Sequence, residues 1–168
     1  MQPITGTAAV VQAANVVAPV RDYDAFFSVA HSLDFGIERL ADFSPDTALS
    51  LTFLCGQATE CTLKALLSHA GVERKALGPK GMGHRLTALW VSAASKSSLH
   101  PTTPPAWIEQ LAQVHGAPYV LRYPMDAHGI VLPAKQPMLE GLKELIAFAR
   151  QQLDHSNLPF EQRSTPFT

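Results

Sequence analysis

The fold is decided by residues 44–71, SPDTALSLTFLCGQATECTLKALLSHAG. Ser44 is a typical helix N-cap, Pro45 suits the first helical position, and Gly71 suits the left-handed residue that ends a helix. The stretch therefore predicts one long helix over residues 45–70. Apolar side chains cover most of its circumference, and one narrow polar stripe remains, formed by Gln57, Glu60, Lys64 and Ser68. A helix that is apolar on nearly all sides is typical of a central helix enclosed by others.

Four further segments carry helical signals. Between residues 23 and 42, apolar residues recur every three or four positions, which predicts an amphipathic helix. Helices are also expected over residues 84–95, over residues 104–115 and from Pro137 onward, whereas residues 117–124 form a connector. We therefore expect an all-α fold, an up-and-down bundle of four to five helices with a long central second helix. The expected division is an N-terminal arm at 1–21, a bundle at 22–154 and a C-terminal tail at 155–168.

Composition restricts the partners and the compartment. The chain has 168 residues, of which 46% are hydrophobic, and 13 Lys and Arg against 14 Asp and Glu. With a net charge of -1 there is no global basic field, so any anion site must be local. Cys55 and Cys61 lie too far apart along one helix to form a disulfide, and unpaired thiols favour the cytoplasm. The apolar stretch at residues 8–20 is too short to span a membrane, so we expect no membrane association.

A glycine-rich stretch, GPKGMGHRLTALW at residues 78–90, precedes the third expected helix. It lacks the Gly-Lys-Ser/Thr ending of a phosphate loop, and no apolar strand precedes it. What remains is a helix start flanked by Lys80, His84 and Arg85, which either holds an anion or forms a solvated turn. Glu60 and Lys64 are likewise open to two interpretations. They either line a groove for a loop or ligand or form a structural ion pair.

Three motifs together resemble the HEPN (higher eukaryotes and prokaryotes nucleotide-binding) superfamily of helical bundles. They are GQATECTLKALLSHAGV from Gly56, GHRLTAL from Gly83 and VLRYP from Val120, and the similarity covers roughly residues 22–154. The resemblance matches Glu60 and Lys64 to family positions on the second helix and implies that His84 docks onto that helix. It implies a groove near the start of the third helix that binds a nucleotide, RNA or a partner protein. The expected ligand-binding residues are Glu60, Lys64, Lys80, Gly83, His84 and Arg85.

The resemblance also implies partners and an alternative activity. Many members of this family form homodimers or pair with a nucleotidyltransferase-like partner protein, so both are expected here. Many members are metal-independent ribonucleases that use an arginine and a histidine separated by four to six residues, and Arg122 and His128 have this spacing. Histidine moves the proton of a ribose hydroxyl while arginine stabilises charge on the phosphate. A third hypothesis is a structural or interaction dimer without catalysis.

Metal and cofactor dependence are not expected. No His-Glu-x-x-His or paired-cysteine spacing occurs, and His100, His115 and His155 are interpreted as loop or helix-end residues. Cys55 and Cys61 are interpreted as core thiols.

Overall fold

The computed structural model describes residues 20–42, 47–117, 119, 121 and 129–153. These residues form six helices and no strand, which confirms the predicted all-α class. The helices are α1 (Asp22–Ala41), α2 (Ala48–His69), α3 (Arg74–Leu77), α4 (Leu86–Ser97), α5 (Ala106–His115) and α6 (Lys135–Leu153).

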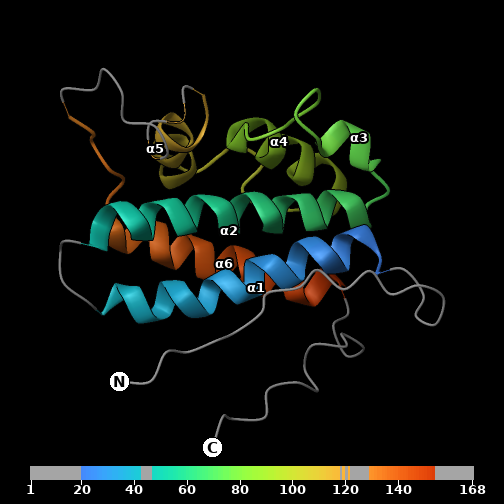
Figure 1. Cartoon of the computed structure of the whole chain (residues 1–168). Helices are drawn as coiled ribbons and strands as arrows, with labels where there is room; N and C mark the ends of the chain where they lie inside the picture. Colours follow the sequence, from blue (N-terminus) through green and yellow to red (C-terminus); the bar gives the residue numbers. More distant parts are fainter. Residues whose placement is uncertain (1–19, 43–46, 118, 120, 122–128, 154–168) are drawn as a thin grey trace, which may run out of the picture.

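Helix α2 is the central element, as its sequence predicts. Figure 1 shows α1 and α6 on one side of α2 and α4 and α5 on the other, and α2 contacts all four of these helices. Leu63, Leu66 and Leu67 on α2 are at most 1% exposed. Burying each leucine stabilises the fold by about 1.5–3 kcal/mol, so the apolar circumference of α2 explains its enclosure.

The helix boundaries depart from the expected ones by about two residues, as helix ends commonly do. Pro104 was expected at the first position of α5, but that prediction is wrong because the helix begins at Ala106. Pro104 precedes Pro105, and a residue before proline is disfavoured in the α region. Helix α6 begins at Lys135, two residues before Pro137. Pro137 lacks a backbone N–H, but the N–H groups in the first turn of a helix have no intrahelical partner, so no helical hydrogen bond is lost. The expected capping residues Ser44 and Pro45 lie outside the described residues.

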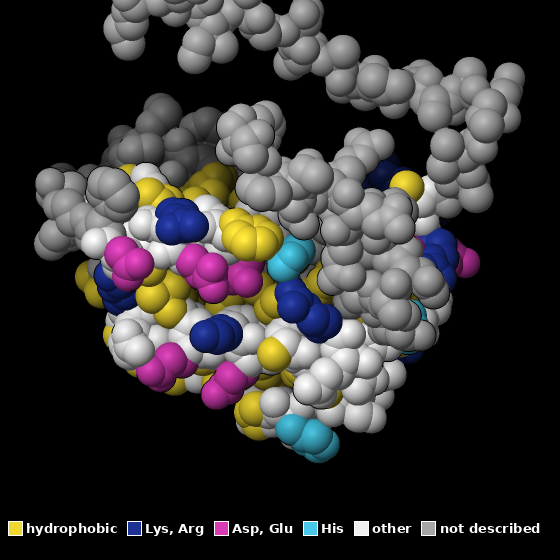
Figure 2. Space-filling view, turned by 90° about the horizontal axis from the view of Figure 1, so that it is seen from below, with side chains coloured by type: hydrophobic (Ala, Val, Ile, Leu, Met, Phe, Trp, Pro, Cys, Tyr) yellow, Lys and Arg dark blue, Asp and Glu magenta, His cyan; other side chains and the backbone are white. Residues whose placement is uncertain are grey.

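The surface formed by α1 and α6 has a mixed character. Figure 2, seen from below, shows Lys and Arg side chains interspersed with Asp and Glu, and hydrophobic groups between them. No single-sign field covers this face, which agrees with the net charge of -1. Among the described helices, none is both long enough and apolar enough to cross a bilayer.

Candidate functional site

A buried carboxylate joins three parts of the fold. Glu60 lies in the middle of α2 and is 5% exposed. Its Oε1 accepts a hydrogen bond from Lys64 Nζ at 2.7 Å, and its Oε2 lies 2.8 Å from His84 Nδ1 and 2.8 Å from His115 Nε2. His84 precedes α4, and His115 is the last residue of α5. We call these four residues the Glu60 cluster. The contact expected between His84 and the long helix is therefore present.

The turn before α4 places His84 on Glu60. Backbone N–H groups of Gly81 and Gly83 both donate to the carbonyl of Gly78, which folds the segment back on itself. Gly83 has φ +56°, a conformation that glycine adopts without strain. A Cβ on Gly81 would overlap the backbone of Ala76. These two glycines therefore form a tight turn rather than a phosphate loop, and the turn directs His84 toward α2.

His115 is the residue that sequence reasoning missed. It ends α5 as expected, but its side chain is only 1% exposed and contacts Glu60. Gly56, one turn before Glu60 on α2, makes room for it, since a Cβ at this position would overlap the His115 ring. A glycine inside a buried helix is unfavourable by about 1 kcal/mol. Gly56 was therefore the available signal that another group approaches α2 closely here.

Glu60 is held in its ionised form. Burial opposes ionisation, but hydrogen bonds from His115, Lys64 and His84, together with the charge of Lys64, lower the pKa of Glu60 from 4.5 to about 2. Because an ionised carboxylate only accepts hydrogen bonds, each histidine must donate a ring N–H to it. The proton of a neutral His84 is then on Nδ1, which leaves Nε2 for a ligand or a proton.

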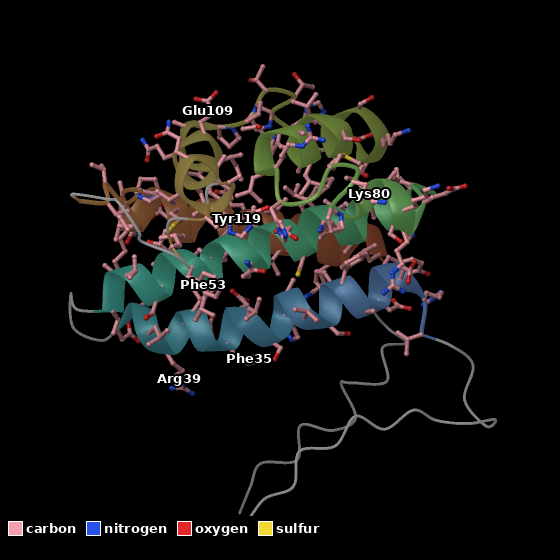
Figure 3. The ribbon with its side chains drawn as sticks, turned by 45° about the horizontal axis from the view of Figure 1, so that its top comes forward. Phe35, Arg39, Phe53, Lys80, Glu109 and Tyr119 are labelled. Atoms are coloured by element: carbon pink, nitrogen blue, oxygen red, sulfur yellow. The ribbon has the colours of Figure 1, made fainter. Side chains whose placement is uncertain are left out.

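The other predicted ligand residues lie beside the cluster rather than in it. Lys80 and Arg85 are exposed on the segment between α3 and α4, where Figure 3 labels Lys80. Arg85 donates to the carbonyls of Gly81 at 2.6 Å and Met82 at 3.2 Å. The structure thus brings Glu60, Lys64 and His84 together and leaves Lys80 and Arg85 at the nearby surface. The predicted catalytic pair, Arg122 and His128, lies outside the described residues.

Two further features mark this region. The Tyr119 ring packs edge-on against His84 at 5.6 Å between centroids, and Tyr119 has φ +60°. Such strain in a non-glycine residue concentrates at functional sites. Gln57 Nε2 is buried without a hydrogen-bond partner within the described part of the chain. Gln57 lies one turn before Glu60 and so shares its side of α2.

The cluster also contains a group of potential metal ligands. Three residues, Glu60, His84 and His115, each place one potential ligand atom within 4.8 Å of the other two. They come from separate parts of the chain and share no local sequence motif. Two imidazoles and a carboxylate suit a transition metal such as zinc. Lys64, however, occupies the second oxygen of Glu60, and its ammonium would repel a dication. The hydrogen bonds already satisfy the carboxylate, so the cluster is complete as an ion-pair network.

The chain matches no protein-family model, no curated protein and no solved structure. Its function is therefore inferred from the chemistry of the site.

Proposed function

We propose that the protein is a HEPN-like binding module and that the corner around His84 binds a phosphate group of a nucleotide or RNA. The observation that carries the proposal is the state of His84. Its Nδ1 is engaged by the buried Glu60, yet the His84 side chain is 29% exposed. A histidine oriented from behind in this way presents Nε2 as a positioned donor or acceptor.

The start of α4 adds groups that favour an anion. No side chain caps this helix, and its first turn contains no acidic residue. The first backbone N–H groups of a helix lack intrahelical partners and carry partial positive charge. Lys80 and Arg85 add two full positive charges at the same corner. A phosphate there would meet backbone donors, a histidine and two cations without any acidic neighbour from the first turn of α4.

The overall charge limits the class of ligand. A protein that held long nucleic acid by backbone contacts alone would need an extended basic face. The net charge of -1 provides no basic field over the molecule as a whole. A mononucleotide or a short single-stranded segment fits a local site better.

Binding is tested by titrating the full chain with ATP, a short single-stranded RNA and inorganic phosphate in EDTA. We expect Lys80→Gln and Arg85→Gln each to weaken binding about tenfold, which corresponds to about 1.4 kcal/mol. Lys75→Gln is the matched control, because Lys75 is equally exposed but lies on α3. Equal losses for all three variants, or no binding by the parent, would refute a site at this corner.

The same titration distinguishes a ribonuclease. If the protein cleaves the RNA in EDTA, and both Arg122→Ala and His128→Ala abolish this cleavage, the protein is a metal-independent nuclease and not a binding module. Binding without cleavage supports the module.

An interaction surface is a second candidate, because α2 carries an apolar hollow near its start. The hollow is lined by Leu49, Phe53, Leu54, Leu121 and Ser50, and Leu49 is 43% exposed. Such a patch is typical of a site that a second protein chain covers. If the protein is a homodimer through this hollow, Leu49→Lys converts it to a monomer in light scattering. An unchanged mass would exclude this surface.

A further inference from the structure

A second cavity lies at the other end of α5 from His115. Its volume is about 400 Å³, within the range of small-molecule sites. Trp107, in its wall, precedes His115 by eight residues, or about 12 Å along the helix axis. The cavity is therefore separate from the His84 corner. Its lining includes the aromatic and apolar residues Trp90, Leu99, Trp107 and Phe148, and the titratable residues His100 and Glu144.

Three aromatic rings dominate this lining. The rings of Trp90 and Trp107 stand at 88° to each other with centroids 6.1 Å apart, and Phe148 lines the cavity from α6. The indole N–H of Trp90 donates to the carbonyl of Pro101 at 2.9 Å, so its polar atom is already used. What the Trp90 ring offers a ligand is its π surface.

The backbone is adapted to hold this arrangement. Gly141 lies inside α6, where a Cβ would overlap the Trp107 indole. Glycine is unfavourable in the interior of a helix, and here its missing side chain leaves room for Trp107. Ser98, also in the lining, is the left-handed residue that ends α4, with φ +57°.

The charge in the lining identifies the class of ligand. Glu144 lies one turn before Phe148 on α6, and it forms no ion pair within the described residues. Among the described residues that line the cavity, none is a lysine or an arginine, and His100 is the one titratable side chain besides Glu144. Aromatic faces attract cations, and a carboxylate at the same site adds to this attraction. We propose that this cavity binds a small alkylammonium cation, with the cation against the aromatic rings and Glu144 as its counter-ion.

The chain has a built-in reporter for this proposal. It contains two tryptophans, and both line the cavity. Choline is titrated into the full-length protein while tryptophan fluorescence is recorded, and 3,3-dimethylbutan-1-ol serves as its uncharged analogue of the same shape. We expect a saturable change with choline and at least about tenfold weaker binding of the alcohol, since the alcohol can form neither a cation–π contact nor an ion pair.

Two substitutions on α6 sharpen the test. Glu144→Gln keeps the shape but removes the charge, so we expect choline to bind about fivefold more weakly while the alcohol is unaffected. Glu140→Gln, one turn earlier and outside the lining, is the control and should bind as the parent does. Equal affinity for choline and the alcohol, a response without saturation, or equal effects of the two substitutions would overturn the proposal. Circular dichroism of each variant verifies that the fold is retained.

Discussion

Replacing Gly56 with alanine tests the packing on which the Glu60 cluster depends. A Cβ at this position would overlap the His115 ring, which is almost completely buried and hydrogen-bonded to Glu60. Because the overlap is with atoms of the ring itself, we expect His115 to be displaced. Elsewhere in a helix, the same substitution is favourable by about 1 kcal/mol.

The expected magnitude follows from two contributions that destabilise the fold and one that stabilises it. Overpacking a well-filled core costs about 1–3 kcal/mol, and losing a hydrogen bond to a charged group costs about 1.5–3 kcal/mol. Subtracting about 1 kcal/mol for the higher helix propensity of alanine leaves a net destabilisation of about 1.5–5 kcal/mol. That is a large share of the roughly 5–15 kcal/mol that stabilises a typical domain.

Urea unfolding followed by circular dichroism measures this free energy. Gly36→Ala is the matched control, because Gly36 is also helical but a Cβ there would meet only Leu54 Cδ1 at 3.9 Å. We expect the control to be stabilised by up to about 1 kcal/mol. In a His115→Ala background, Gly56→Ala should lose its penalty, because the clashing ring is gone. If Gly56→Ala is as stable as the parent protein, the close approach of His115 to α2 is wrong.

Three further predictions concern acid, thiols and the aromatic cavity. Because the folded pKa of Glu60 is about 2 and its ordinary value is 4.5, its contribution to stability is present above pH 4.5 and is lost as pH falls toward 2. The difference corresponds to about 3 kcal/mol, and the unfolding free energy of Glu60→Gln should fall less than that of the parent over this window. Burial raises the pKa of Cys55 to about 12 and that of Cys61 to about 11. Both thiols should therefore react slowly with Ellman's reagent at pH 8 until urea unfolds the chain. Fast reaction of both thiols in the native protein would contradict these raised pKa values. Gly141→Ala should displace Trp107 and change the tryptophan emission maximum, and an unchanged spectrum would argue against that contact.

The central helix and part of the site could be predicted because their signals are local. The apolar circumference of α2 and the i, i+4 spacing of Glu60 and Lys64 are properties of one continuous segment. His84 follows a glycine turn whose geometry depends on near neighbours. The resemblance to HEPN bundles then indicated which helix His84 would contact.

His115 and the aromatic cavity could not be predicted in this way. His115 is 55 residues from Glu60 along the chain, and their contact depends on how α5 docks onto α2. Trp90, Trp107 and Phe148 come from three different helices. Their periodicity predicts burial for each but does not predict that they meet. Helix α3 has only four residues, too few for a periodic pattern.

The energetics of the Glu60 cluster indicate a positioning role. A buried ion pair is weak evidence for stability, because apolar side chains of the same volume often stabilise a core as well or better. Glu60 and Lys64 are buried where α2, the turn before α4 and the end of α5 meet. A carboxylate that requires three hydrogen-bond donors is satisfied only when the segments that carry these donors have the correct positions relative to one another. Apolar contacts between helices allow small shifts of one helix along the other. The cluster therefore defines where α4 begins relative to α2, and with it the position of His84, the residue on which the proposed phosphate site depends.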